Sequence, residues 1–155
     1  MRVLLVEDTD NKRRELELFI ENAIVGADVI VAKSLQAALK VMSSDVIDLV
    51  ILDMSLPAFD ISVSEDGFKH LPYAGCDVLE FIDSRDIDVL VVVVTAFGQF
   101  GQGLDVKTLT QLNAELTRDY QGIYLGYVTY SAIADQWRTD LLQILQENVR
   151  SIAHD

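Results

Sequence analysis

The sequence predicts an α/β protein built on a doubly wound, five-stranded parallel sheet. Continuous apolar runs of four to seven residues recur along the chain of 155 residues, and helical apolar patterns separate them. Runs without polar alternation are typical of parallel strands covered by helices on both faces. The predicted strands are residues 3–6, 29–32, 46–52, 89–94 and 123–128.

Five helices are predicted, each with apolar residues repeating every three or four positions. The first follows a cap among residues 8–10, Ser34 caps the second, and the third begins at about Cys76. The marking residues, helix by helix, are Leu16, Phe19, Ile20, Ala23 and Ile24; Leu35, Ala38, Leu39 and Met42; Val78, Leu79, Phe81 and Ile82; Leu109, Leu112 and Leu116; and Trp137, Leu141, Ile144, Leu145 and Val149.

Charge and composition narrow the function classes. The net charge of −13 repels phosphate backbones and anionic lipids, so we expect no direct binding to nucleic acid or membranes. No apolar run is long enough to span a bilayer and no signal peptide is visible, which predicts a cytoplasmic protein. The single cysteine, Cys76, argues against disulfide or zinc chemistry. We expect one domain over residues 1–155.

Three carboxylates stand at predicted strand ends. Glu7 and Asp8 follow the first strand, and Asp53 ends the run "VILD" of the third. In a doubly wound sheet these two strands are adjacent, so the carboxylates should converge. Such hard oxygen ligands suit Mg²⁺, and Thr95, at the end of the fourth strand, can hydrogen-bond a phosphoryl oxygen. Each residue alone could equally be a cap, turn or strand residue.

The stretches "RVLLVED", "LVILDMSLP" and "VVVVTA" together resemble the receiver domain of bacterial response regulators. The resemblance implies a flavodoxin-like three-layer α/β/α sandwich in two-component signalling. It implies that Asp53 accepts a phosphoryl group and that Thr95 contacts it. Glu7, Asp8 and Asp53, with the backbone carbonyl of Ser55, would arrange Mg²⁺. A histidine kinase or phosphotransfer protein would be the phosphoryl donor.

The sequence departs from this family after the fifth strand. Receivers usually carry a lysine there, whereas this region reads "GIYLGYVTYSAIADQW". Tyr127 or Tyr130 stands in the place of the lysine, depending on the alignment. A tyrosine donates a hydrogen bond but brings no positive charge. Thr95 is one switch candidate. Tyr124, Tyr127 and Tyr130 are candidates for the family's switch aromatic, although they could simply pack the strand and its exit.

Two segments are longer than the resemblance leads us to expect. Residues 58–75 follow the aspartate without clear periodicity, and residues 97–120 extend the connection between the fourth strand and the fourth helix. The first could be a flap, a docking loop or a tolerated insertion. We expect no output domain after residue 155, so the signal would pass through protein contacts, to an unknown downstream partner or within a homodimer.

Three functions are weighed. The first is a stand-alone receiver phosphorylated on Asp53, a signalling protein rather than an enzyme. The second is a pseudo-receiver that binds partners without phosphorylation, which the missing lysine and the two extended segments favour. The third is an aspartate-nucleophile phosphatase, but that family places a second aspartate two residues after the first, where this chain has Ser55.

Overall fold

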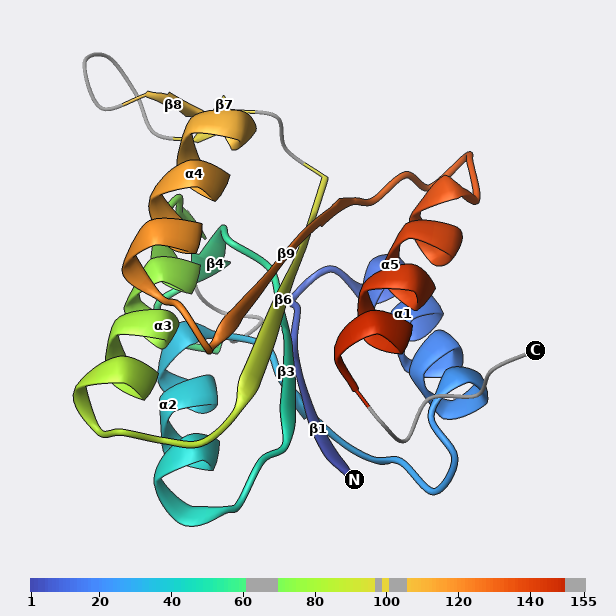
Figure 1. Cartoon of the computed structure of the whole chain (residues 1–155), viewed down its shortest axis with the longest axis horizontal. Helices are drawn as coiled ribbons and strands as arrows, with labels where there is room; N and C mark the ends of the chain where they lie inside the picture. The colour runs from blue at the N-terminus through green and yellow to red at the C-terminus, as the bar shows by residue number, and fades with distance from the viewer. Residues whose placement is uncertain (61–69, 97–98, 101–105, 150–155) are drawn as a thin grey trace.

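The central sheet has five parallel strands in the order β2-β1-β3-β6-β9 (Figure 1). The computed structural model describes residues 1–60, 70–96, 99–100 and 106–149. The order confirms the predicted sheet, in which the first and third strands are neighbours. The strands are β1 (Arg2–Val6), β2 (Asp28–Ala32), β3 (Leu49–Leu52), β6 (Leu90–Thr95) and β9 (Tyr124–Thr129).

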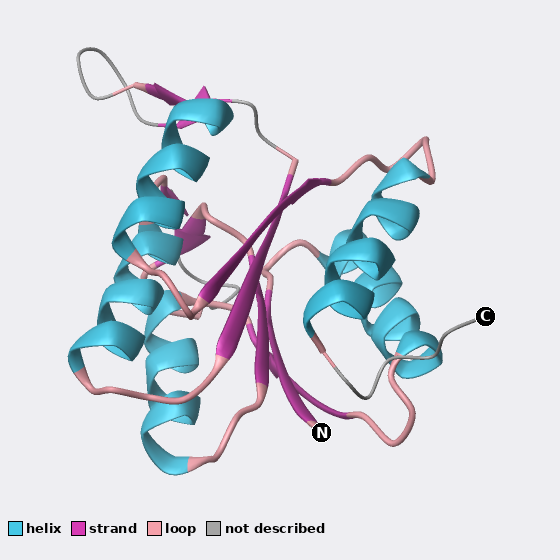
Figure 2. Ribbon diagram, in the orientation of Figure 1, coloured by secondary structure: helices cyan, strands magenta, loops and turns pink. Residues whose placement is uncertain are grey.

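The helices form two layers around the sheet (Figure 2). On one face lie α1 (Asp10–Ala23) and α5 (Gln136–Asn148), and on the other lie α2 (Leu35–Ser44), α3 (Ala74–Ser84) and α4 (Leu109–Asp119). The three-layer sandwich is therefore confirmed. Among the helices that the structure describes, none combines the length and apolar character needed to cross a membrane.

Each face of the sheet is covered by its own hydrophobic core. On the α1/α5 face, the indole of Trp137 is buried between the rings of Phe19 and Tyr130, with ring centroids 5.7 and 5.4 Å away. The other core joins the opposite side chains of the same strands to α2, α3 and α4. The central strands β1, β3 and β6 contribute to both cores, as their unbroken apolar runs predict.

Local signals set most element boundaries, with one correction. The Oγ of Ser34 accepts the backbone N–H of Ala37 at 3.1 Å, which confirms the predicted cap of α2. The third strand was predicted to start at Val46, but β3 starts at Leu49 and the side chain of Val46 is exposed. The reason is that α2 ends in a cap at Asp45, so Val46 belongs to the turn that reverses the chain.

Each of the two lengthened segments takes part in a short antiparallel pair of strands. Within residues 58–75, β5 (His70–Leu71) returns to pair with β4 (Leu56–Pro57). Within residues 97–120, β7 (Gln99–Phe100) pairs with β8 (Lys107–Thr108), and Thr108 then caps α4. Residues 61–69, 97–98 and 101–105 of these segments lie outside the described residues.

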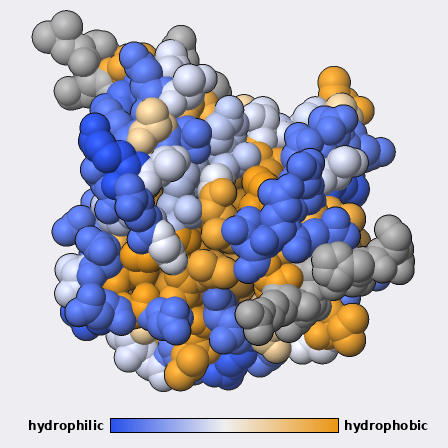
Figure 3. Space-filling model, viewed as in Figure 1, coloured by the Kyte–Doolittle hydropathy of each residue, from blue (hydrophilic) through white to orange (hydrophobic). Residues whose placement is uncertain are grey.

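A bulge in β9 determines the side of the sheet on which its tyrosine side chains pack. The register with β6 shifts between Val91 and Val92, so that Tyr124 and Tyr127 both pack on the α4 side although they are three residues apart. Gly126, with φ of +138°, provides the backbone conformation at this shift. In the view of Figure 3, hydrophobic residues gather in the centre of the surface, where β9 runs between α4 and α5.

We predict that Gly126→Ala destabilises the fold, because a Cβ is strained at this positive φ even though its nearest neighbour, Cδ1 of Ile144, would lie at an ordinary contact distance of 3.8 Å. The expected loss is about 1–3 kcal/mol in the free energy of unfolding, measured by urea denaturation. Thr129→Ala, at an exposed position of the same strand, is the control and should change stability by less than about 0.5 kcal/mol. Equal stability of the two variants would contradict a strained bulge.

Candidate functional site

The register of β1 and β3 brings the predicted carboxylates together. Val6 pairs with Leu52, and the N–H of Asp53 donates to the carbonyl of Val6 at 3.0 Å, so the residues after both strands are adjacent. One carboxylate oxygen from each of Glu7, Asp8 and Asp53 lies within 4.8 Å of the others. The sequence therefore identified this cluster correctly.

The cluster is buried, and burial sets its electrostatics. The side chains of Glu7 and Asp53 are 1% and 5% exposed. Burial raises the pKa of Glu7 and of Asp8 above their ordinary values because it disfavours the charged carboxylate, and the neighbouring carboxylates add to the effect. A cation is the physical complement of such a cluster.

A lysine from α1 provides one such cation. The side chain of Lys12 is 4% exposed, and its Nζ lies 2.6 Å from Oε2 of Glu7 and 3.1 Å from Oδ2 of Asp53. The same ammonium donates to the backbone carbonyl of Val94 in β6 at 2.8 Å. Lys12 therefore links the ends of three neighbouring strands.

A histidine from the lengthened segment reaches the other side of the cluster. Nε2 of His70 lies 2.8 Å from Oδ2 of Asp8, and its Nδ1 lies 3.3 Å from the hydroxyl of Ser55. The pairing of Pro57 with His70 places the imidazole there. Residues 58–75 thus contribute a side chain to the site.

The loop after Asp53 is hydrogen-bonded to the start of α3. The N–H of Met54 donates to Oδ1 of Asp53 at 2.7 Å, and the N–H of Gly75 donates to the carbonyl of Met54 at 2.9 Å. A Cβ on Gly75 would lie 2.9 Å from the Met54 side chain and 3.0 Å from the carbonyl oxygen of Asp53. Glycine is therefore required for this close approach. The nearby Cys76 thiol has a pKa raised to about 11 by burial and stays neutral.

Thr95 and Tyr130 stand at the ends of the next two strands. Val93 pairs with Leu52, so the buried Thr95 lies just beyond the level of Asp53. The N–H of Tyr130 donates to the carbonyl of Thr95 at 2.9 Å, and its hydroxyl donates to Glu15 at 2.7 Å. The ring centroid of Tyr130 is 5.7 Å from Nζ of Lys12.

The other two tyrosines lie farther along β9. The hydroxyl of Tyr124 donates to Oδ1 of Asn113 in α4 at 2.7 Å, and burial raises the pKa of this phenol. Tyr127 packs in the core on the α4 side. Among the three tyrosines proposed as the switch aromatic, Tyr130 is the one whose ring approaches Lys12.

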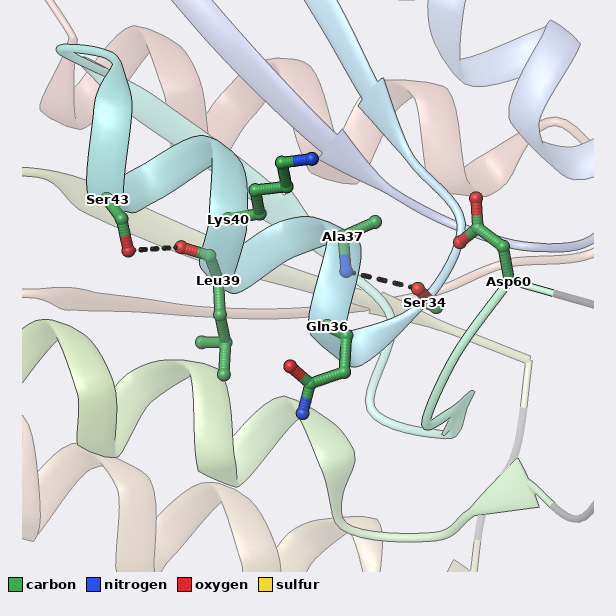
Figure 4. Close-up of a pocket in the computed structure, with 7 residues that line it drawn as sticks. All are labelled: Ser34, Gln36, Ala37, Leu39, Lys40, Ser43 and Asp60. Atoms are coloured by element: carbon green, nitrogen blue, oxygen red, sulfur yellow. Dashed lines mark hydrogen bonds between the residues drawn. The ribbon is translucent and has the colours of Figure 1, made fainter.

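A hollow on the surface of α2 is separate from the carboxylate cluster (Figure 4). Two of its hydroxyl groups are engaged within the helix, because Ser34 caps Ala37 and Ser43 donates to the carbonyl of Leu39. None of its lining residues belongs to the carboxylate cluster, so it adds nothing to the chemistry there. They are Ser34, Gln36, Ala37, Leu39, Lys40, Ser43 and Asp60.

Comparison with known proteins decides the family. The response regulator receiver domain matches residues 3–114. A relative that is 31% identical over 150 residues is the Detocs response regulatory protein DtcB of Enterobacter cloacae (strain JD6301), with 95% of this chain and 99% of the relative covered. This chain belongs to the response regulator receiver domain family. Uncharacterized protein y4jR of Sinorhizobium fredii (strain NBRC 101917 / NGR234) is 29% identical over 140 residues, covering 90% of this receiver and 93% of the relative.

Solved structures share the fold of this receiver. A response regulator receiver domain protein from Clostridium thermocellum superposes with a TM-score of 0.63 at 17% identity, covering 94% of this chain and 91% of that chain. The response regulator TrrA from Thermotoga maritima, solved in complex with Mg²⁺-BeF, gives 0.56 at 23% identity, covering 93% and 98%.

Sequence reasoning missed two residues of this receiver's site, Lys12 and His70. A signal for Lys12 was present, because it lies four residues before Leu16 and eight before Ile20 and so extends the apolar stripe of the first helix. A lysine on the buried face of a helix is expected to have a negatively charged partner, because lysines are rarely buried unless they are paired. His70 had no such signal, since its position depends on a two-residue strand pairing in a segment without periodicity.

We predict that Asp8→Asn stabilises the receiver at pH 7 without divalent cations, by about 1 kcal/mol in the free energy of unfolding. Because burial raises the pKa of Asp8, the folded state holds this proton more tightly than the unfolded state, and stability falls as pH rises above the unfolded value near 3.8. The gain should therefore shrink as pH is lowered toward 4.

The control is Asp10→Asn. The hydrogen bond from Arg13 lowers the pKa of this exposed carboxylate, so its removal should not stabilise the protein. Thermal unfolding at several pH values measures both variants. A lower melting temperature for Asp8→Asn at pH 7 would mean that the contact between Asp8 and His70 outweighs the burial of charge.

Proposed function

We propose that this chain works as a stand-alone receiver that accepts a phosphoryl group on Asp53 and signals through protein contacts. The observation that carries the proposal is the placement of the Asp53 carboxylate at the end of β3, beside Glu7 and Asp8 and next to the strand that ends in Thr95. Membership of the receiver family and the similarity to a response regulatory protein support this reading.

The proposed transfer is a simple displacement. A carboxylate oxygen of Asp53 attacks the phosphorus of a phosphohistidine on a histidine kinase or phosphotransfer protein. The new P–O bond forms as the P–N bond breaks, and the departing imidazole nitrogen keeps the electron pair and takes a proton. The hydroxyl of Thr95 is the proposed hydrogen-bond donor to the transferred group.

Glu7, Asp8, Asp53 and the backbone carbonyl of Ser55 are the proposed ligands of Mg²⁺. The residues fit, because they are hard oxygen donors and because Oδ1 of Asp8 is buried without a hydrogen-bond partner among the described residues. When bound, Mg²⁺ would neutralise charge on the phosphoryl oxygens. The solved complex of TrrA with Mg²⁺-BeF supports the choice of ion.

The face around β9 is the proposed output surface. It lies between α4 and α5 and carries the apolar surface seen in Figure 3. Tyr124 and Tyr127 connect β9 to the α4 side, and Tyr130 connects its end to the α1/α5 side. A change at the phosphorylation site could reach a downstream protein or a second copy of the chain here.

A pseudo-receiver is the second candidate function, and Lys12 favours it. The ammonium pairs with Glu7 and Asp53, so a side chain of the protein itself partly neutralises the cluster. In that case the ion pairs would be structural, and partner binding would not depend on phosphorylation.

We predict that acetyl phosphate with Mg²⁺ adds one phosphoryl group to the wild-type protein, detected by intact-protein mass spectrometry. Asp53→Asn should remain unlabelled because the acceptor oxygen is lost. Asp88→Asn, an exposed carboxylate before β6, is the matched control and should be labelled like the wild type. Equal labelling of the wild type and Asp53→Asn would exclude Asp53 as the acceptor, and no labelling of the wild type would favour the pseudo-receiver.

A further inference from the structure

The site contains a buried cation in an unexpected place. Receivers are expected to carry a lysine after the fifth strand, but in this chain β9 is followed by Tyr130. The cation comes instead from Lys12, in the first turn of α1. Its ammonium touches two carboxylates and one carbonyl, and these belong to the ends of three different strands.

The side chains at positions 12 and 130 lie close to each other in space. Tyr130 leaves β9 beside Thr95, and its ring lies 5.7 Å from Nζ of Lys12. The phenol does not enter the carboxylate cluster, because its hydroxyl is held by Glu15 of α1. A side chain from position 130 and one from position 12 can therefore reach the same space, and in this chain the lysine occupies position 12.

We infer that Lys12 is the phosphoryl-pairing cation of this receiver, in place of the absent lysine after the fifth strand. The inference rests on the proposed phosphorylation of Asp53. Once Asp53 carries a phosphoryl group, Oδ2 no longer offers a full negative charge to Lys12, and the new phosphoryl oxygens lie within reach of the same ammonium. A charge-assisted N⁺–H···O⁻ bond to phosphate replaces the bond to the carboxylate.

Charge balance supports this role. Glu7, Asp8 and Asp53 bring three carboxylates together at one site. Among the described residues, Lys12 is the one lysine or arginine that forms an ion pair with Glu7 or Asp53. His70, from the opposite side, contacts Asp8. Transfer of a phosphoryl group adds further negative charge there, so the ammonium becomes more important in the phosphorylated state than before it.

The position of Lys12 also connects the site to α5. Its ammonium faces Tyr130, Tyr130 donates to Glu15, and Glu15 lies 4.0 Å from the guanidinium of Arg138 in α5. When the ammonium of Lys12 exchanges the carboxylate of Asp53 for a phosphoryl oxygen, its contact with the Tyr130 ring changes with it. Lys12 would thus carry the state of Asp53 to the α1/α5 side of the molecule.

The test compares Lys12→Gln with Lys12→Arg and the wild type. Glutamine keeps a donor for Val94 but removes the charge, and arginine keeps the charge. We expect Lys12→Gln to lower the acetyl phosphate labelling rate and the beryllofluoride affinity by about 10- to 100-fold. Lys12→Arg should retain most of both. Lys40→Gln, an exposed lysine on α2, is the control and should match the wild type.

Relocation of the charge separates this role from a structural one. In Lys12→Gln/Tyr130→Lys the cation returns to the position after the fifth strand, and labelling should recover by at least about tenfold over Lys12→Gln. A structural role for Lys12 would not produce this recovery. Circular dichroism checks that each variant is folded, and if Lys12→Gln does not fold, the folded double variant provides the comparison with the wild type.

The outcomes distinguish the two proposals. Labelling of the wild type with equal labelling of Lys12→Gln would overturn the role of Lys12 and leave the phosphorylation of Asp53 intact. A folded double variant that stays unlabelled would also overturn it. No labelling of the wild type, with no beryllofluoride binding, would overturn both proposals together.

Discussion

The burial of several carboxylates at one edge of a parallel sheet is the constraint on which the rest of this site depends. The register of β1 and β3 makes it unavoidable, because the residues that follow paired strands are neighbours. Burial raises the pKa of Glu7 and Asp8, which shows that the charged cluster is under electrostatic strain. Lys12 contacts Glu7 from one side of the cluster, and His70 contacts Asp8 from the other. Burial of several like charges in one place lowers the stability of the folded state.

The origin of the cation matters for how a receiver can respond. A lysine after the fifth strand would tie the site to β9, whereas Lys12 ties it to α1 and, through Tyr130 and Glu15, to α5. The bulge at Gly126 separates Tyr124 and Tyr127, on the α4 side, from Tyr130 at the exit of the strand. The aromatic residues of β9 therefore belong to two different layers, and a signal from the site would reach the two layers by different contacts.

The lengthened segments are integrated into the fold rather than appended to it. The pairing of β4 with β5 brings His70 to Asp8, so the lengthened segment after Asp53 contributes a side chain to the acidic site. The pairing of β7 with β8 precedes the cap of α4 at Thr108, and α4 is one of the two helices that border the proposed output surface. Both departures from the usual receiver thus lie where phosphorylation would be sensed or transmitted.

The sequence by itself determined the strands, the layers, the carboxylate cluster and the family, because apolar periodicity and residues at strand ends are local patterns that a parallel sheet converts directly into positions. It showed that a lysine was missing after the fifth strand, but not that another had taken a place in the cluster. Only the tertiary structure decided that, because Lys12 becomes a site residue through the packing of α1 against the ends of β1, β3 and β6. The same holds for His70, whose position follows from a two-residue pairing too short to leave a pattern in the sequence.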